Sequence, residues 1–213
     1  MNDFSKWHWE VTGKRVVETL RKNNFTADYF VDKETALAHV LGQISPGVTV
    51  GVGGSSTERA MGLAAALEKS GHTVYDHNKA DLTPEQRADC RQEQLNCDVF
   101  ITSVNAVTMK GELVNRDGLG NRVAAMIYGP KKVLVVVGVN KLVKDLQAAD
   151  DRIRMVAAPL NSKRLNLDNP CVKTGHCADC SSPTRICNVT AVMHKQPMGG
   201  NVHVLLIGEE LGY

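Results

Sequence analysis

Two unbroken aliphatic runs constrain the fold of this chain more than any other feature of its sequence. Residues 133–137 read Val-Leu-Val-Val-Val, and a second apolar run covers residues 98–102. Aliphatic runs without polar alternation are typical of strands buried on both faces, as the inner strands of a parallel sheet are. The two runs therefore predict an α/β protein whose sheet is covered by helices on both sides.

The rest of the chain supplies the other parts of such a fold. Strands are also expected near residues 48–52, 72–75 and 202–207, and residues 106–114 predict a hairpin that turns at Lys110-Gly111. Apolar residues recur at helical spacing between most of these strands. Helices are expected at residues 5–22, 33–44, 58–69, 83–96, 120–127 and 142–153. This alternation predicts a three-layer α/β/α domain around a mainly parallel sheet.

The charge and the cysteine content of the chain limit its partners and its compartment. The net charge is +2, from 25 basic and 23 acidic residues, which gives no electrostatic reason to expect nucleic acid or a membrane surface as a partner. The first ten residues contain no apolar stretch that a signal peptide would need. We therefore expect a cytoplasmic protein whose six cysteines are reduced or bound to metal.

A polar, glycine-rich segment lies between the two aliphatic runs, and it starts where the strand at residues 98–102 ends. Ligands of open α/β sheets bind outside the carboxyl ends of the strands, so this segment is expected to be the functional centre. Glu112 and Asp117 are its candidate general bases, because acid–base catalysis needs a carboxylate near the ligand. Its candidate ligand contacts are Asn105, Asn115, Asn121 and Arg122.

Arg122 has two interpretations of equal weight. It falls in the first turn of the predicted helix at residues 120–127, where a positive charge opposes the helix dipole. The unfavourable interaction with the helix dipole is offset if the side chain binds an anion. Alternatively, Arg122 forms a structural salt bridge with Asp117 or Glu112.

A second candidate anion site follows the strand at residues 48–52. The sequence Gly53-Gly54-Ser55-Ser56-Thr57 leads from this strand into a helix, and such a turn presents backbone N–H groups and hydroxyls to an anion. It matches neither the dinucleotide fingerprint nor a P-loop. The same residues could simply form a tight turn and an N-cap. Lys141 follows the strand at residues 133–137 and is either a ligand contact or a solvated helix start.

Four cysteines near the end of the chain give the most specific chemical signal. Their spacing is C-x5-C-x2-C-x6-C, in a loop at residues 166–190 that is inserted before the last strand. Four thiolates so close together are typical ligands of Zn²⁺ or of an iron–sulfur cluster, and the spacing alone does not decide between them. A redox pair of Cys177 and Cys180 is a further alternative. The predicted metal ligands are Cys171, Cys177, Cys180 and Cys187.

Several of these motifs together resemble the LUD-domain family, the lactate-utilisation protein C-like group. The resemblance covers nearly the whole chain, residues 1–213, as a single LUD-like domain, and the cysteine loop resembles that of a cysteine-bearing subset. It implies a fold like that of ribose-5-phosphate isomerase and the CoA transferases, with an anion at Gly53–Thr57. Gly111, Asn115 and Gly118 match a segment near the active sites of relatives. The motifs that carry the resemblance are residues 53–57, 102–106, 111–115, 117–118, 120–125, 129–130 and 139–141.

The resemblance also implies a function. We expect a subunit or accessory enzyme of 2-hydroxy-acid (lactate) oxidation that binds a small anionic metabolite. Because other members of that pathway carry iron–sulfur clusters, a [4Fe–4S] cluster is favoured over Zn²⁺, with iron–sulfur redox proteins as partners and a homo-oligomer as a further possibility. The alternatives are an isomerase or acyl/CoA-type transferase acting on a phosphorylated or thioester substrate, with a structural metal, and a non-enzymatic ligand-binding protein. The resemblance supplies no settled catalytic residues.

Overall fold

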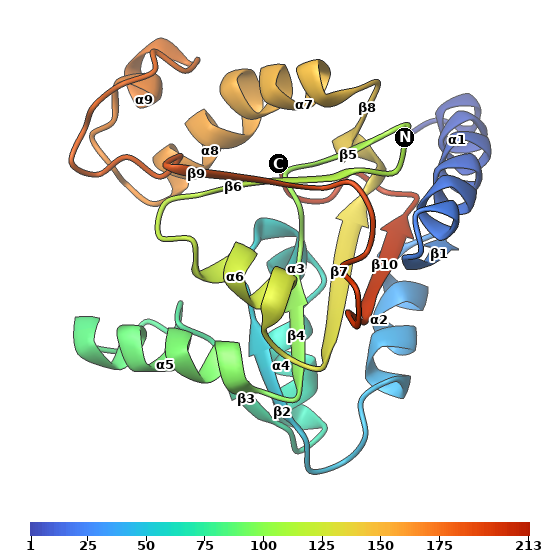
Figure 1. Ribbon diagram of the computed structural model, residues 1–213, viewed down its shortest axis with the longest axis horizontal. Coiled ribbons are helices and arrows are strands. Elements are labelled where there is room, and N and C mark those ends of the chain that lie inside the picture. Colours follow the sequence, from blue (N-terminus) through green and yellow to red (C-terminus); the bar gives the residue numbers. More distant parts are fainter.

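The protein is an α/β structure built on a six-stranded sheet in which every neighbouring pair of strands is parallel (Figure 1). The computed structural model describes all residues from 1 to 213. The expected α/β class with a parallel sheet is therefore confirmed. In spatial order the strands are β1 (Thr26–Phe30), β10 (Val202–Ile207), β7 (Lys132–Gly138), β4 (Val99–Thr102), β2 (Thr49–Val52) and β3 (Thr73–Tyr75).

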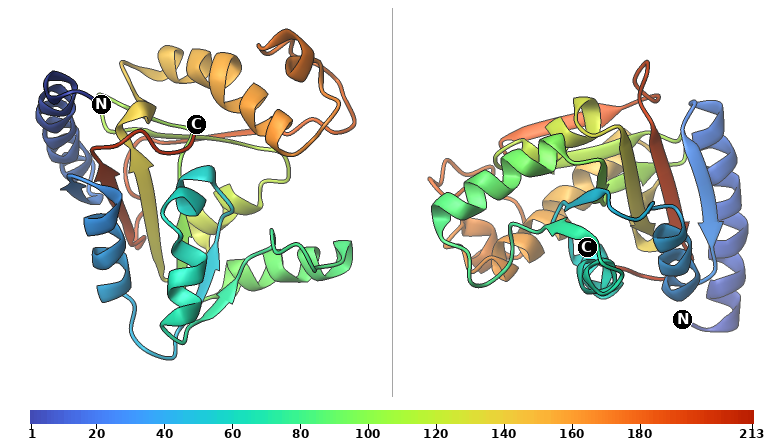
Figure 2. Two further views of the ribbon diagram at one scale, coloured as in Figure 1. Left: turned by 180° about the vertical axis from the view of Figure 1, so that it is seen from behind. Right: turned by 90° about the horizontal axis from the view of Figure 1, so that it is seen from below.

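Helices cover both faces of this sheet, which explains the aliphatic runs. In β7, Val133, Val135 and Val137 pack into one core cluster, whereas Leu134 and Val136 pack into the cluster on the opposite face. A strand buried on both faces has no position for a polar side chain. One face carries α1 (Asp3–Lys22), α5 (Pro84–Asn96) and α6 (Asn121–Tyr128); the other, seen in Figure 2, carries α2 (Lys33–Gly42), α3 (Ser56–Ala60) and α4 (Leu63–Lys69).

A small mixed sheet lies across the carboxyl ends of the central strands (Figure 1). The predicted hairpin is confirmed, because β5 and β6 pair antiparallel. A long helical stretch packs on this sheet through Ala149 and Ile153. The sheet contains β8 (Leu142–Val143), β5 (Ala106–Thr108), β6 (Leu113–Asp117) and β9 (Val189–Met193), and the helical segments beyond it are α7 (Leu146–Arg152), a π-helical turn (Ile153–Ala157), α8 (Ala158–Arg164) and α9 (Pro170–Thr174).

Two helices differ from the expectation. The single helix expected at residues 58–69 is broken into α3 and α4 at Gly62, whose φ of 66° lies in the left-handed region that glycine adopts readily. The helix expected from residue 142 begins only at Leu146, because Asp145 caps it and Leu142 pairs with Val107 in the small sheet. One strand also differs: β9, which lies between the cysteine loop and β10, was not expected from the sequence.

The connections after β2 and β4 diverge, and this positions the site. β2 leads through α3 and α4 to β3, on one side of it, whereas β4 leads through the small sheet and α6 to β7, on the other side. Adjacent parallel strands with diverging connections leave a crevice at their carboxyl ends, which is where α/β proteins bind ligands. None of the helices is both long and apolar enough to cross a membrane.

Candidate functional site

A cavity of about 330 Å³ lies at this switch point. Its lining comes from the turn after β2, the loops after β3 and β4, the end of β6 with the start of α6, the turn after β7, the helices α5 and α8, and the cysteine loop. The lining residues include Gly53, Gly54, Ser55, Ser56, Arg87, Arg91, Ser103, Asn105, Arg116, Asp117, Asn121, Arg122, Lys141, Arg164 and Ile186.

The cavity is strongly basic. Five arginines and Lys141 line it, against a single carboxylate, Asp117. Arg116 is paired with Asp150 (2.6 Å), and Arg122 with Asp117. The four remaining cations form no ion pair with a carboxylate, so a positive potential is left in a concave site, as anion-binding sites require. These four are Arg87, Arg91, Lys141 and Arg164.

Lys141 is the deepest of these cations. It ends the 3₁₀ turn Val139–Lys141 after β7, and it is 2% exposed, so the alternative of a solvated helix start is wrong. Its Nζ donates to Thr57 Oγ1 at 2.9 Å and to Ser103 Oγ at 3.0 Å. Burial, followed by the nearby charges of Arg152 and Arg122, lowers the pKa of Lys141 to about 7. The amine is therefore divided about equally between its charged and neutral forms at neutral pH.

The glycine-rich turn after β2 forms the opposite wall. A Cβ atom on Gly53 would lie 2.6 Å from Thr102 Oγ1, and Gly54 has a φ of +79°, so both positions require glycine. The N-cap interpretation is confirmed, because Ser55 accepts the backbone N–H of Glu58 at 3.1 Å. Ser55 and Ser56 also line the cavity, whereas Thr57 lies behind it and supports Lys141. The turn therefore serves as a cap and as a cavity wall together.

Glu58 is a buried acid that the sequence analysis did not find. It is 4% exposed, and its Oε2 accepts the backbone N–H of Gly54 at 2.8 Å. Its Oε1 has no hydrogen-bond partner. Burial raises the pKa of Glu58 to about 7. The available signal was a carboxylate placed directly after the glycine–serine turn predicted to bind an anion, where it accepts a backbone N–H group of that turn.

Asp117 and Arg122 form an ion pair in the wall of the cavity. Arg122 Nε donates to Asp117 Oδ1 at 2.9 Å, and Asp117 Oδ2 accepts the backbone N–H of Val123 at 3.1 Å. Arg122 also donates to the carbonyl oxygen of Ser103 (2.8 Å) and to Asn105 Oδ1 (2.9 Å). The predicted salt bridge between Arg122 and Asp117 is thus confirmed, and the pair anchors the loop after β4.

The other residues of the polar segment divide into two groups. Asn105 and Asn121 line the cavity. Glu112 and Asn115 do not: Glu112 lies at the β5–β6 turn, where it accepts Thr108 Oγ1 (2.9 Å) and pairs with His194 (2.9 Å). Asn115 is 1% exposed inside the small sheet, and its Oδ1 has no partner. The structure therefore brings Asp117, but not Glu112, to the cavity.

The arginines of α5 and α8 are further residues that the sequence analysis missed. The helix expected at residues 83–96 is confirmed as α5, which begins with a capping box of Thr83 and Gln86. Arg87 and Arg91, however, are spaced i, i+4 on one face, and that face borders the cavity. This spacing was the available signal, although a solvated face would show the same pattern.

The cysteine loop forms another wall of the cavity. Ile186 lines the cavity and packs so closely on Gly118 that a Cβ there would lie 3.1 Å from Ile186 Cα. The backbone N–H of Asn188 donates to the Asp117 carbonyl oxygen at 2.9 Å, and that of Cys177 to the Arg154 carbonyl oxygen at 2.9 Å. The loop is thus fixed at Cys177 and at Asn188, beside the candidate anion-binding residues.

The thiols of this loop suit a metal centre in number and chemistry. All are free; Cys171 is buried on α9, and Cys177, Cys180 and Cys187 are half-buried. Burial raises the pKa of the Cys187 thiol, and the neighbouring Cys177 and Cys180 add to this effect. A bound cation would offset the repulsion between such thiolates. The donor set therefore fits either a tetrahedral ion or an iron–sulfur cluster in number and chemistry, but no three of these sulfur atoms lie within 4.8 Å of one another.

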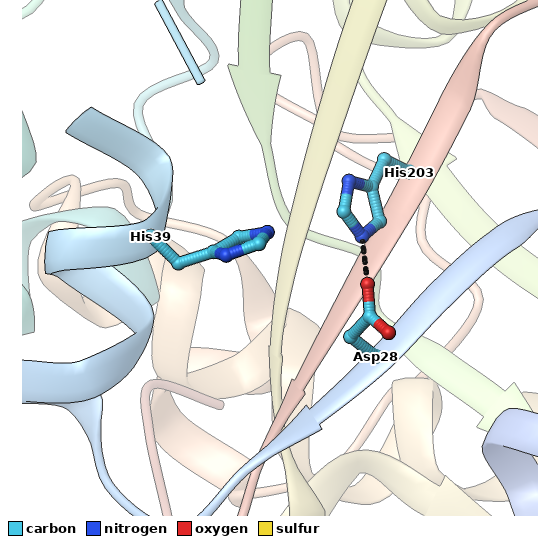
Figure 3. A group of neighbouring side chains, drawn as sticks. All are labelled: Asp28, His39 and His203. Atoms are coloured by element: carbon cyan, nitrogen blue, oxygen red, sulfur yellow. Dashed lines mark hydrogen bonds and ion pairs between the residues drawn. The ribbon is translucent and has the colours of Figure 1, made fainter. Parts of the chain in front are cut away.

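A separate polar cluster, also with metal-ligand chemistry, lies at the edge of the main sheet (Figure 3). His203 Nε2 lies 2.8 Å from Asp28 Oδ2, and Arg21 also pairs with Asp28 at 2.8 Å. The side-chain amide of Gln43 lies 2.6 Å from His39 Nε2 and 3.2 Å from His203 Nδ1. These groups satisfy one another, so hydrogen bonding within the protein accounts for the cluster.

Comparison with known proteins gives a family and a fold. Residues 13–207 match the LUD domain. Among solved structures, a DUF162 family protein from Deinococcus radiodurans is similar with a TM-score of 0.54, at 11% sequence identity, over 93% of this chain and 98% of that chain. At this identity the structural match shows the fold alone. No curated protein matches the chain.

Proposed function

The chain belongs to the LUD-domain family, and we propose that it is a cytoplasmic subunit or accessory enzyme of 2-hydroxy-acid oxidation, with lactate as the expected acid. In this proposal the cavity binds a small organic anion, and the adjacent loop holds an iron–sulfur cluster. Iron–sulfur redox proteins would be its electron-transfer partners.

The observation that carries the proposal is the set of unpaired cations around one cavity. Arg87, Arg91 and Arg164 form no ion pair with a carboxylate of the protein, so their charges are available to the carboxylate of a ligand. Arg87 and Arg164 do donate to uncharged oxygens, those of the His77 carbonyl and the Asn161 side chain. Lys141 and Ser103 lie deeper and offer polar hydrogens to the hydroxyl or oxo oxygen of the same ligand. A 2-hydroxy acid has these two features on adjacent carbon atoms.

The position of the cysteine loop supports the redox part of the proposal. Cys171, Cys177, Cys180 and Cys187 would hold the cluster, which would supply one-electron transfer. Ile186, the residue before the last of these cysteines, lines the cavity. A cluster in this loop would therefore lie beside the bound anion. A structural zinc ion would use the same ligands but could not accept electrons.

Anaerobic purification followed by absorption spectroscopy and metal analysis tests this proposal. We expect iron and sulfide, with a visible band that dithionite bleaches. Cys180→Ser should lose the band, and Cys90→Ser, which changes a thiol on α5 outside the loop, should keep it. A colourless protein that contains zinc would contradict the redox part.

Ligand binding is tested separately by calorimetry. Lactate and pyruvate should bind, whereas the uncharged amide of lactate should not. Arg91→Gln should weaken binding, and Arg15→Gln, which removes an exposed arginine of α1, should not. Equal affinity for lactate and its amide would contradict an anion site.

The size of the cavity favours a second candidate function, that of an isomerase or acyl/CoA-type transferase. Its volume of about 330 Å³ reaches the range of about 300–1,000 Å³ typical of pockets for much larger ligands than lactate. A phosphorylated or thioester substrate would place its own anionic groups near the arginines of α5. Competition between lactate and sugar phosphates or acyl-CoA in the same calorimetric experiment would discriminate between the two candidates.

A further inference from the structure

Ser103 and Lys141 lie side by side at the base of the cavity. Ser103 follows β4, Lys141 follows β7, and their side chains meet with Oγ and Nζ 3.0 Å apart. Both are nearly fully buried, at 1% and 2% exposure, yet both line the cavity. No carboxylate forms an ion pair with Lys141. A hydroxyl within hydrogen-bond distance of a buried, unpaired amine is the arrangement of a nucleophile and its base.

We propose that Ser103 and Lys141 form a serine–lysine dyad that transfers acyl groups from thioesters or esters carrying an anionic group. Ser103 is the nucleophile, and Lys141 is the general base. The inference rests on the anion-binding part of the proposed function but uses neither the cluster nor the oxidation of a hydroxy acid. It therefore gives the second candidate function, acyl transfer, a nucleophile and a base.

The surroundings of Lys141 favour the neutral amine that a base must be. Thr57 Oγ1 accepts from Nζ and donates its own hydrogen to the Leu211 carbonyl oxygen at 3.0 Å. Thr57 can therefore orient the amine without offering it a negative charge. The lone pair of the neutral amine can then accept the hydroxyl hydrogen of Ser103 over 3.0 Å, which is shorter than the 3.4 Å from Ser103 Oγ to its other acceptor, Thr57 Oγ1. Burial and the charges of Arg152 and Arg122 lower the pKa of Lys141 to about 7 against the opposing charge of Glu58, which supports this assignment.

The loop that carries the nucleophile is held rigidly. Arg122 donates to the Ser103 carbonyl oxygen and to Asn105 Oδ1, and the backbone N–H of Arg116 also donates to Asn105 Oδ1 at 2.8 Å. Two donors on the same oxygen fix the orientation of the Asn105 amide, so its NH₂ group remains available to the cavity that Asn105 lines. Such a donor can stabilise the oxyanion of an acyl-transfer intermediate. Arg122 is a positioning residue in this scheme.

The reaction is balanced without a further cofactor. The Oγ of Ser103 bonds to the carbonyl carbon while its proton passes to Lys141 Nζ. The C–S or C–O bond of the substrate then breaks, and the leaving group takes that proton. Water or an acceptor alcohol attacks the acyl-serine, giving its proton to Lys141, which returns it to Ser103 Oγ as the C–O bond breaks.

A fluorophosphonate probe tests the dyad in the intact protein, with the modified residue located by mass spectrometry. We expect one label per chain, on Ser103, and a labelling rate that rises with pH through about 7 as Lys141 loses its proton. Ser103→Ala should abolish labelling. Lys141→Arg keeps the charge but not the base and should slow labelling by at least about 100-fold. Ser70→Ala, at the exposed end of α4, is the matched control and should label at the wild-type rate.

Two results would overturn the dyad. One is a wild-type protein that is not labelled at any pH from about 6 to 9, a range that spans the expected titration. The other is an equal rate in wild type and a folded Lys141→Arg variant. The pH profile of the wild type needs no variant, so it remains decisive if substitutions at this buried position prevent folding. Anion binding, measured by calorimetry on the same samples, shows separately whether the proposed function stands.

Discussion

Arg122 and Asp117 form a closed pair inside the wall of the cavity, with side chains that are only 14% and 8% exposed. Asp117 also accepts the first-turn N–H of Val123, and Arg122 reaches back to the Ser103 carbonyl oxygen. The pair therefore ties β6, α6 and the loop after β4 together. A carboxylate held in this way stabilises the site rather than standing free to take a proton.

Breaking this pair should be costly to stability. Arg122→Gln leaves a buried carboxylate without its cation and should lower the free energy of unfolding by about 3–5 kcal/mol. Asp117→Asn should have a similar effect. Because each change removes the same interaction, the double variant should lose less than the sum of the two. Urea unfolding checks this, and additive effects would show that the two side chains do not depend on each other.

Arg91 should behave in the opposite way. It makes no ion pair, so Arg91→Gln should leave the unfolding free energy within about 0.5 kcal/mol of wild type. The affinity for an anionic ligand should fall roughly 10- to 100-fold, because a charge-assisted hydrogen bond is lost. Calorimetry at two salt concentrations measures this effect, and Arg15→Gln is the control. A large loss of stability in Arg91→Gln would mean that the residue is structural.

Glu58 should make stability depend on pH. Its folded pKa of about 7 is higher than the usual 4.5, so the native state binds the proton more tightly than the unfolded state does. The stabilisation is complete below pH 4.5 and is lost as the pH rises through about 7. Relative to Glu58→Gln, the wild type should lose on the order of 3 kcal/mol across this range. Parallel pH profiles of the two proteins in urea unfolding would rule this out.

Removing the metal centre that we propose for the cysteine loop should loosen the cavity. The wall formed by Ile186 is joined to the cysteine loop, and the N–H of Asn188 is bonded to Asp117. Cys180→Ser, or treatment with a chelator, should increase hydrogen exchange at Asn188 and Gly118 and weaken ligand binding several-fold. Cys90→Ser should change neither. Unchanged exchange in the metal-free protein would show that the loop is held by its backbone contacts alone.

The main sheet could be predicted because the aliphatic composition of its central strands indicates burial on both faces. Val133–Val137 must be buried on both sides, wherever the neighbouring strands come from. The pairing of β1 with β10 could not be predicted, because Thr26 meets His203 only in the folded chain. The break at Gly62 was missed because the apolar spacing continues through it.

The candidate site was predicted in part for similar reasons. The turn at Gly53 and the position of Lys141 follow from where strands end, so the sequence located them. The contribution of Arg87 and Arg91 depends on which face of α5 turns toward the cavity, and this is set by packing between distant segments. In the sequence, Glu58 cannot be told from any other helix residue. Only the structure shows that its carboxylate is buried and accepts the backbone N–H of Gly54.

The position of β10 in the main sheet affects how the protein folds during its synthesis. The last strand of the chain inserts between β1 and β7, so it is an interior strand of the sheet. β1 and β7 are synthesised long before β10, the strand that lies between them in the sheet. Until β10 has been synthesised, one edge of the valine-rich β7 is unpaired and prone to aggregation. The six-stranded sheet can therefore be completed only after residues 202–207 have been synthesised. A premature stop before residue 202 would leave a chain for chaperones and proteases to clear, whatever remains of its ligand-binding residues.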